Sequence, residues 1–464
     1  MATASLAPVA ASPAMAARTR QLLDGAIVPT LLRLAAPNVA VMMIQAILTT
    51  ADAFWVGRLG ADALAGVSLV FPLVMLMQTM SAGGMGGGVA SAVARALGGG
   101  RRQEASALVA HALVIALVMG ALFTVVVVGA GPAAYRAMGG RDGALDAALI
   151  YSNVVFAGAV APWLYNILGS VVRGTGNMGV PALVMALSAL VQVVLTPVLV
   201  FGWAGAPRLG IAGAGVSTVV AFALGSAILL AYLRSERSLV RLELRGVRLR
   251  AALFADILRV GAPGALNTIL TNLTVVFLTG LVGPFGTFAL AGYGMGARLE
   301  YLQIPLVFGF GSALVAMVGT NVGAGRLARA ERVAWVGAAL AAGVTSVIGL
   351  AGAIAPWLWL GMFTSDASVL LAGTLYLRIV GPFYGFFGLG LALYFASQGA
   401  GRLLWPLVAG FIRITVAALG GYVVTRWIGL DLPWLFAIMA LALVCFGTTN
   451  ALAVRAGAWR TGRR

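Results

Sequence analysis

The sequence predicts an all-α membrane protein with about twelve transmembrane helices in two pseudo-symmetric six-helix bundles. Hydrophobic residues make up 61% of the 464 residues and charged residues only 9%, with a mean hydropathy of +1.02. A soluble globular domain carries about 25% charged residues, so that class is excluded. The chain also repeats itself, because Arg33-Leu-Ala-Ala-Pro37 returns as Arg259-Val-Gly-Ala-Pro263. Internal repeats in so apolar a chain are typical of transporters that bind substrate between their halves.

Uncharged runs divide the chain into helices. A helix needs about 20 apolar residues to cross the hydrocarbon core. Runs longer than this, which split further at Gly and Pro clusters, cover residues 105–135, 147–172, 174–207, 209–233, 260–297, 333–365 and 432–454. We therefore predict, in order, a cytoplasmic tail (1–28), a six-helix bundle (29–233), a basic connector (234–255), a second six-helix bundle (256–455) and a basic tail (456–464).

The basic residues predict the topology. The net charge is +17, and most of the basic residues, all of them arginine, fall in alternate loops and in the tails. By the positive-inside rule this pattern places both termini in the cytoplasm. Anionic lipid headgroups account for the charge, so no nucleic-acid partner is expected. The single cysteine, Cys445, excludes an intramolecular disulfide, and we expect no metal site and no cofactor.

Asp52 is the first candidate functional residue. It lies in the apolar stretch 39–55, and its counterpart in the second repeat is Leu278. A carboxylate at membrane depth costs about 2.5–3.5 kcal/mol on insertion scales, and such groups typically relay protons, bind ions or pair with cations. Since the repeat lacks the acid, we expect it to serve function and not the scaffold. The alternative is a structural hydrogen bond to a neighbouring helix.

Glu300 is the second acid at membrane depth, near the centre of its predicted helix. The alternative to a functional role is an internal salt bridge. Arg298 lies two residues away, on a different face of the helix, so a partner would be Arg378 or Arg413.

Two prolines and a set of aromatic residues complete the candidates. Pro37 and Pro263 occupy equivalent positions in the repeats and are candidate hinges, unless each marks a helix start. Aromatic clusters predict contacts to a large apolar ligand. The residues predicted to bind substrate, besides Glu300, are Tyr165, Asn166, Tyr301, Phe383, Tyr384 and Phe387.

Several segments resemble the multidrug and toxic compound extrusion (MATE) family over roughly residues 29–455. They are Pro37 with Asp52-Ala-Phe-Trp-Val-Gly-Arg-Leu-Gly60, Arg173-Gly-Thr-Gly-Asn177, Gly319-Thr-Asn-Val-Gly-Ala-Gly325 and Tyr394-Phe-Ala-Ser-Gln-Gly-Ala-Gly401. The resemblance implies two six-helix bundles facing a central cleft and cation-coupled antiport of organic compounds. It places the family's first-helix acid at Asp52, and the proline whose bending follows its protonation at Pro37.

The chain also departs from the family pattern. Many prokaryotic members carry Asn and Asp before a proline in the fifth helix, where this chain has Gln192 and Thr196 before Pro197. The Glu and Asp of sodium-coupled members are absent from the corresponding stretches, 267–274 and 382–391. The resemblance therefore leaves the coupling ion open between H⁺ and Na⁺.

We predict a non-enzymatic exporter of amphipathic, mainly cationic, organic molecules that acts as a monomer among the lipids of a bacterial cytoplasmic membrane. Asp52 would carry the coupling proton, with Gln192, Thr196, Tyr165 and Asn166 hydrogen bonding around it, and Glu300 would be the counter-charge for substrate. The alternatives are a Na⁺-coupled exporter, a flippase for a lipid-linked precursor, and a scaffold or channel. A flippase would need several basic residues in the cleft, and only Arg298, Arg378 and Arg413 lie in predicted spans.

Overall fold

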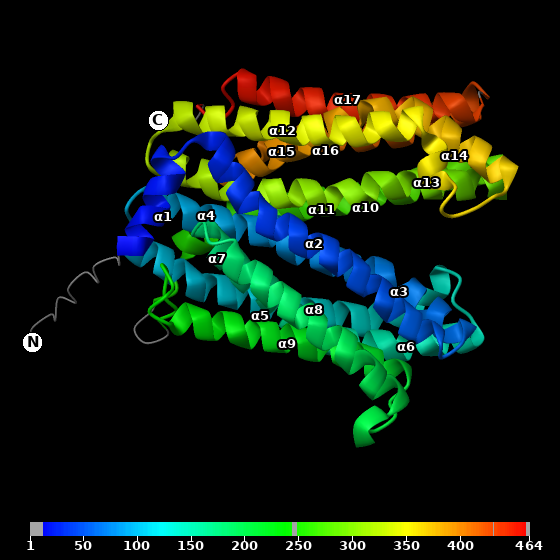
Figure 1. Cartoon of the computed structure of the whole chain (residues 1–464), viewed down its shortest axis with the longest axis horizontal. Coiled ribbons are helices and arrows are strands. Elements are labelled where there is room, and N and C mark those ends of the chain that lie inside the picture. Colours follow the sequence, from blue (N-terminus) through cyan, green and yellow to red (C-terminus); the bar gives the residue numbers. More distant parts are fainter. Residues whose placement is uncertain (1–12, 244–247, 430, 461–464) are drawn as a thin grey trace, which may run out of the picture.

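Two lobes of roughly parallel helices make up the structure, which is a computed structural model (Figure 1). It describes residues 13–243, 248–429 and 431–460, apart from the side chains of 13–16 and 43–53, and every regular element within these ranges is helical. The lobes meet at the end where α1 and the last turn of α17 lie, and they diverge toward the opposite end (Figure 1). We call these the closed end and the open end.

Six helical rods form each lobe, and some rods consist of consecutive helices. The N-terminal lobe contains α2 (Ile27–Gly57), α3 (Ala61–Thr79) continued by the π-helical turn η1 (Met80–Met85) and α4 (Gly86–Gly98), α5 (Arg102–Ala137), α6 (Asp142–Ala157) with α7 (Val160–Gly174), α8 (Gly179–Phe201) and α9 (Ile211–Arg234). The C-terminal lobe contains α10 (Ala251–Val282), α11 (Thr287–Gly323), α12 (Leu327–Ile354), α14 (Ala367–Val380) with α15 (Tyr384–Ala400), α16 (Leu404–Thr415) continued by π-helical turns to Trp427, and α17 (Leu432–Arg455). Two short helices, α1 (Pro13–Asp24) and α13 (Pro356–Leu360), precede α2 and follow α12.

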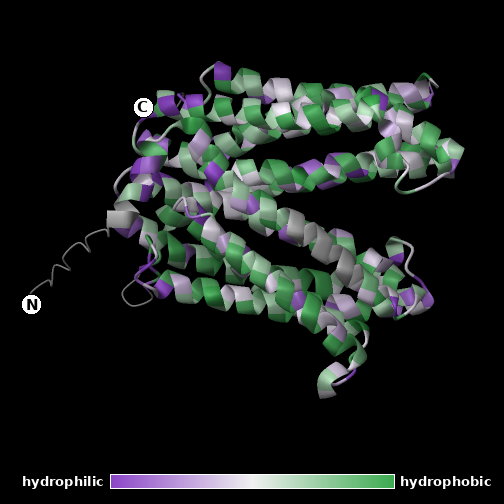
Figure 2. Cartoon of the chain, in the orientation of Figure 1, coloured by the Kyte–Doolittle hydropathy of each residue, from purple (hydrophilic) through white to green (hydrophobic). Residues whose placement is uncertain are grey.

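The predicted fold class is confirmed. Ten continuous helical stretches are long and apolar enough to cross a membrane, and α6 with α7, bent by 49°, supplies an eleventh. α2, with 31 residues, completes twelve rods. Large apolar side chains such as Val125 and Leu183, 72% and 71% exposed, lie on the outside of the lobes where lipid would cover them. Hydrophilic residues gather at the ends of the rods (Figure 2).

Parts of the two predicted tails fold onto the C-terminal lobe. Leu22 of α1 is buried, and its carbonyl accepts a hydrogen bond from Asn321 Nδ2 of α11 at 3.1 Å. Trp459, beyond α17, is also buried and donates its indole N–H to Ser397 Oγ at 3.2 Å. Neither segment contains a span-length apolar run, which is why the sequence pattern assigned both to tails.

The first helix of each lobe crosses to the other lobe. Early in α2, Asn38 Nδ2 donates to Ser312 Oγ of α11 at 2.7 Å, whereas late in α2 the ring of Trp55 packs against Phe201 of α8 with centroids 6.2 Å apart. α10 makes the reverse crossing, since it packs first on η1 and α4 of the N-terminal lobe and then on α16 of its own lobe.

Pro37 and Pro263 lie at these crossings, inside continuous helices. α2 begins at Ile27 and α10 begins at Ala251, well before either proline. The alternative that each proline marks a helix start is therefore wrong. Their predicted role as hinges stays a prediction, and their position between the two packing partners of each helix is consistent with it.

The crossings depend on glycines that leave no space for a side chain. A Cβ on Gly84 of η1 would lie 2.7 Å from Ala265 N, and a Cβ on Gly309 of α11 would lie 3.2 Å from Val39 N. The repeat relates these two contacts to each other, since Gly309 follows Gly84 by 225 residues and Ala265 follows Val39 by 226. Glycine allows helix backbones to approach closely in lipid, so each lobe presents the same kind of notch to the first helix of the other.

We predict that Gly84→Ala destabilises this arrangement and that Gly83→Ala does not. At position 84 the new methyl group meets backbone atoms of α10, whereas at position 83 the nearest atom is on the Phe308 ring at 3.9 Å, an ordinary contact. Overpacking of a tight contact costs about 1–3 kcal/mol. The check is the thermal unfolding midpoint of the purified protein in detergent, and equal midpoints for the two variants would contradict the role of the notch.

Candidate functional site

Gln192 and Thr196 lie on α8 and contact α9. Gln192 Nε2 donates to Thr218 Oγ1 at 3.3 Å, and Thr196 Oγ1 lies 2.8 Å from Ser217 Oγ. α2 also packs along α8, so the helix that carries Asp52 runs beside this group. The side chain of Asp52 lies outside the described residues, and its role as proton carrier stays a prediction.

Tyr165 and Asn166 of α7 have different neighbours. Asn166 Nδ2 donates to Gln78 Oε1 and to Ser81 Oγ, both at 2.8 Å, and the Tyr165 ring packs edge-on against Phe222 at 5.2 Å. The amide of Asn166 therefore holds η1, the turn that receives α10. Of the four residues predicted to surround Asp52, Gln192, Thr196 and Tyr165 therefore lie toward α9, whereas Asn166 lies toward η1.

Glu300 of α11 is paired inside the C-terminal lobe. Arg413 Nη2 of α16 donates to Glu300 Oε1 at 3.3 Å, and the Tyr376 hydroxyl of α14 donates to Glu300 Oε2 at 3.1 Å. The Arg413 and Glu300 side chains are only 12% and 15% exposed. The alternative considered from the sequence, an internal salt bridge, is thus present, and its partner is Arg413.

Aromatic rings enclose this ion pair. The Arg413 guanidinium lies over Phe387 and Phe446, with 5.4 and 5.5 Å from Cζ to the ring centroids. Cation–π contacts of this kind stabilise a desolvated guanidinium by up to about 2 kcal/mol. The pair and its rings form a compact polar centre in an apolar lobe.

The other aromatic candidates divide by exposure. Tyr384 and Phe387 are buried in the C-terminal lobe, whereas Tyr301 and Phe383 are 39% and 37% exposed. Only the exposed pair lies at the surface in this arrangement of the lobes. Tyr384 and Phe387 would reach a ligand only if the lobe's interior opened, so their predicted substrate contacts stay a prediction.

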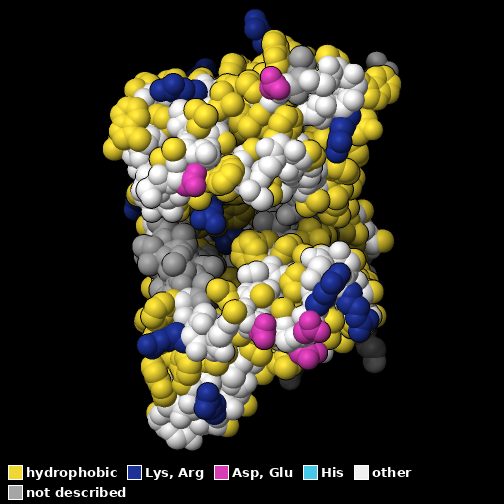
Figure 3. Space-filling model, turned by 90° about the vertical axis from the view of Figure 1, so that its right-hand side faces the viewer, with side chains coloured by type: hydrophobic (Ala, Val, Ile, Leu, Met, Phe, Trp, Pro, Cys, Tyr) yellow, Lys and Arg dark blue, Asp and Glu magenta, His cyan; other side chains and the backbone are white. Residues whose placement is uncertain are grey.

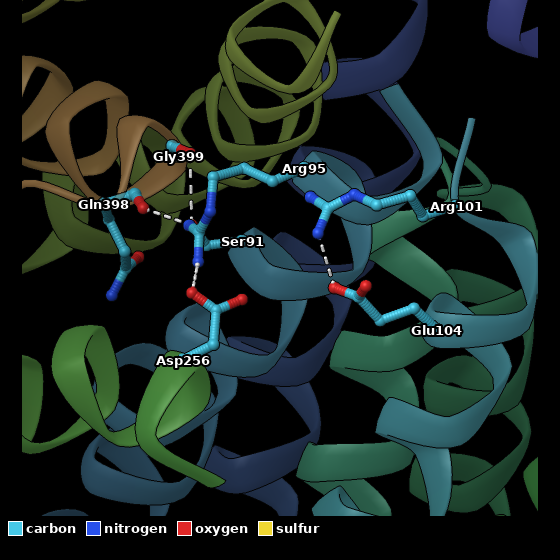
Figure 4. Close-up of polar contacts among 7 residues, drawn as sticks. All are labelled: Ser91, Arg95, Arg101, Glu104, Asp256, Gln398 and Gly399. Carbon is cyan, nitrogen blue, oxygen red and sulfur yellow. Dashed lines mark hydrogen bonds and ion pairs between the residues drawn. The ribbon is translucent and has the colours of Figure 1, made fainter. Parts of the chain in front are cut away.

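Polar contacts lock the lobes together at the closed end (Figure 4). Arg95 Nη2 of α4 pairs with Asp256 Oδ1 of α10 at 2.7 Å, and the other arm of Arg95 contacts Ser91. Ser91 Oγ lies 2.5 Å from the carbonyl of Gln398 and 3.1 Å from that of Gly399, both on α15. The Arg95 side chain is 13% exposed and that of Asp256 is 35% exposed, so the arginine is the better shielded partner of this pair, which joins α4 to the part of α10 that packs on the N-terminal lobe.

A second notch reinforces the closed end. A Cβ on Gly98 of α4 would collide with the Thr320 carbonyl of α11, and a Cβ on Gly323 would collide with the Arg95 carbonyl. The two contacts exchange under the repeat, so α4 and α11 meet on the pseudo-twofold axis.

Sequence patterns do not predict the Arg95–Asp256 pair. Arg95 is one of the loop arginines from which the topology is predicted. Asp256 lies near the end of its predicted helix, where a charged residue is ordinary. The available signal was that Asp256 is the only acid between Arg248 and Arg259, in a segment otherwise selected for positive charge.

His111 anchors the start of α10 to the N-terminal lobe. Its Nε2 accepts a hydrogen bond from the Arg250 backbone N–H at 2.9 Å, and its ring packs on Phe254 at 4.7 Å. Nδ1 then donates to the Ala107 carbonyl, 2.8 Å away, which fixes the neutral tautomer. The only histidine of the chain therefore caps the first turn of α10.

An ion pair outside the spans anchors the start of α2 to the C-terminal lobe. Arg326 Nη1 donates to Asp24 Oδ1 at 2.5 Å, and this hydrogen bond lowers the pKa of Asp24 below its ordinary value. Because the folded pKa lies below the unfolded one, the stabilisation is complete above the ordinary aspartate pKa and is lost as the pH falls through the lowered value. The anchor is therefore intact at neutral pH.

The two halves of the chain match one family model separately. The MatE model matches residues 37–198 and 263–423, which begin at Pro37 and Pro263. The chain belongs to the MATE family. It is therefore a multi-pass membrane transporter, and the family resemblance found in the sequence is confirmed.

Relatives and a solved structure agree with this assignment. The probable multidrug resistance protein YoeA of Bacillus subtilis is 27% identical over 371 residues, which cover 77% of this MATE chain and 78% of YoeA. The FAD transporter of Shewanella oneidensis is 26% identical over 411 residues, which cover 87% and 90% of the two chains. The structure of a MOP superfamily transporter from Pyrococcus furiosus has the same fold, with a TM-score of 0.88, 23% identity, and coverage of 98% of this chain and 100% of that one.

We predict that Asp256→Asn loosens the closed end of the MATE protein. Arg95, whose other arm contacts Ser91 beside α15, would lose its carboxylate partner while remaining shielded, and leaving a buried donor without its acceptor costs about 1–3 kcal/mol. Spin labels on Gln103→Cys and Ala328→Cys, exposed equivalents near the closed end, report the lobe separation in a Cys445→Ser background. The distance distribution should shift to longer values.

Glu104→Gln is the matched control. It removes the same charge from the Arg101–Glu104 pair, also 2.7 Å long, which lies within one lobe (Figure 4). A shift of equal size in both variants would show that net charge, and not the Arg95–Asp256 pair, sets the separation.

Proposed function

We propose that this MATE protein exports amphipathic, mainly cationic, organic compounds by alternating access, driven by inward movement of H⁺. The observation that carries the proposal is the double crossing of α2 and α10. Each begins on one lobe, passes a proline, and continues on the other, so bending at the two prolines would let the lobes rock about the notches. YoeA, named as a probable multidrug resistance protein, supports the substrate class.

The charge distribution supports an orientation for this cycle. The connections at the closed end carry arginine clusters such as Arg101 with Arg102 and Arg326 with Arg329, and by the positive-inside rule these clusters support a cytoplasmic location for that end. The open end then faces outward. Figure 3 views this end and shows a hollow between the lobes, with basic side chains within it. The arrangement corresponds to an outward-open state of a transporter in a bacterial cytoplasmic membrane.

The neighbours of α2 favour H⁺ over Na⁺. A sodium site needs several converging oxygen ligands, including more than one carboxylate in many cases, whereas a proton needs one carboxylate that can titrate. The helix beside α2 supplies only the neutral Gln192 and Thr196, and the second repeat has Leu278 in place of the acid. Asp52 is therefore the proposed proton carrier, and Na⁺ coupling is the alternative.

Asp52→Asn should leave a folded, membrane-inserted protein that no longer exports. The amide keeps the volume of the carboxylate but cannot titrate. We expect substrate efflux from proteoliposomes to stop in this variant, and wild-type efflux to collapse without a pH gradient and to persist without sodium. Full-rate transport by the wild type in a sodium gradient at equal pH would overturn H⁺ coupling, and wild-type rates for Asp52→Asn would overturn the assignment of the carrier.

Glu300 is the proposed counter-charge for a cationic substrate. Its carboxylate is already neutralised by Arg413, so a substrate cation would act by taking the place of that guanidinium. An uncompensated charge in a low-dielectric site is costly, which makes the exchange selective for a positive charge. A flippase for a polyanionic lipid precursor is less well supported, because Arg413 is paired and Arg298 lies over the Phe363 ring at 5.6 Å.

We predict that Glu300→Gln raises KM about tenfold for cationic substrates, ~1.4 kcal/mol, and changes it little for neutral ones. Arg413→Gln in the same chain should restore stability by removing the unpaired guanidinium. Arg378→Gln is the control, since Arg378 is exposed and makes no ion pair among the described residues. Equal losses for cationic and neutral substrates in efflux assays would assign the pair a purely structural role.

A further inference from the structure

A basic cavity lies at the closed end, between the lobes. Its volume is about 350 Å³, within the range of small-molecule sites. The N-terminal lobe contributes Arg95, whereas Asp256, Arg259, Arg402 and Arg460 come from the start of α10 and from the segments after α15 and α17. The lining residues therefore come from both lobes, and they form one cavity only while this end is closed.

The cavity carries more positive charge than its acids neutralise. Of its four arginines, Arg95 pairs with Asp256, and Arg460 pairs with Glu331 through bonds of 2.9 and 2.5 Å. Arg259 and Arg402 make no ion pair with any carboxylate that the structure describes. Two guanidinium groups thus face the cavity without a counter-ion.

The walls are also positioned by packing. Trp459 is buried, and its bond to Ser397 fixes the segment that carries Arg460. Arg402 is half-buried directly after α15, where its backbone N–H donates to the Ser397 carbonyl at 2.9 Å. Of the cavity's arginines, Arg95 and Arg402 are partly buried in the wall, whereas Arg259 and Arg460 are exposed to solvent.

We propose that this cavity binds a phosphate-bearing anion, and that the bound anion stabilises the closed end. Guanidinium groups match phosphate oxygens with paired N–H donors, and unpaired arginines around one cavity are the arrangement that recognises phosphate. Because Arg95 and the start of α10 with Arg259 pack in the N-terminal lobe, whereas Arg402 and Arg460 belong to the C-terminal lobe, binding favours the state that brings the two sides together. The anion is either a lipid phosphate headgroup or a soluble phosphate compound. The site is separate from the transport pathway proposed above.

The test measures the thermal midpoint of the full-length protein. In one arm, pyrophosphate is titrated in detergent against sodium chloride at equal ionic strength. In the other, phosphatidylcholine nanodiscs are compared with and without phosphatidic acid. We expect a saturable rise of the midpoint in at least one arm. A rise with pyrophosphate identifies a soluble anion, and a rise confined to phosphatidic acid identifies a lipid.

Two double variants separate the cavity from general surface charge. Arg259→Gln with Arg402→Gln should weaken the apparent affinity about tenfold or more, ~1.4 kcal/mol. Arg332→Gln with Arg455→Gln removes the same charge from exposed positions of the C-terminal lobe and should change it less than about twofold. Arg402→Lys keeps the charge but not the paired N–H donors. We expect it to lose part of the apparent affinity for the anion, which tests the site even if the double variant does not fold.

The distance between spin labels at positions 103 and 328 tests whether the bound anion stabilises the closed end. The anion should narrow the distance distribution toward short values in the wild type and not in the cavity variant. Failure of both arms to give a saturable rise, or equal losses in the two double variants, would overturn the site. A saturable rise with an unchanged distance distribution would overturn its effect on closure.

Discussion

Close contact between backbones on the pseudo-twofold axis is the constraint on which the closed end depends. Gly98 against Thr320 and Gly323 against Arg95 bring α4 and α11 together without an intervening side chain. Larger residues at the two glycines would separate the helices. Only at this distance do the short Ser91 side chain and the Arg95 guanidinium reach α15 and α10. The hydrogen bonds and the ion pair at this end are therefore consequences of the glycines.

The two repeats share their backbone features but differ in their polar side chains. The notches, the prolines and the helix order recur in both lobes, but Asp52 has Leu278 as its counterpart and Glu300 has no acid at the equivalent place in the first repeat. Each repeat thus carries one of the two acids predicted at membrane depth. In the proposed cycle, movement would follow from the shared framework, whereas selectivity for a proton or a substrate would follow from what differs between the halves.

The fold and the candidate acids could be predicted from the sequence because both depend on local composition. Span-length apolar runs mark the helices, and a carboxylate inside such a run stands out whatever surrounds it. Partners could not be predicted in the same way. The choice of Arg413 over Arg378 for Glu300, the pairing of Asp256 with Arg95, and the crossing of α2 and α10 all depend on which helices become neighbours, and hydropathy does not encode this. Trp459 was missed because one buried indole leaves no periodic pattern.

The exchanged contacts of the two notches have the form of an isologous interface, in which one patch meets its own copy across a twofold axis. A homodimer of a six-helix chain would make each of these contacts twice, with its first helix swapped into the partner subunit. Fusion of the two copies would retain that interface and turn an association equilibrium into an intramolecular one, since a linker replaces free concentration by a fixed effective concentration. Neither lobe alone then provides all the packing contacts of its own first helix, so the two lobes together form the folding unit.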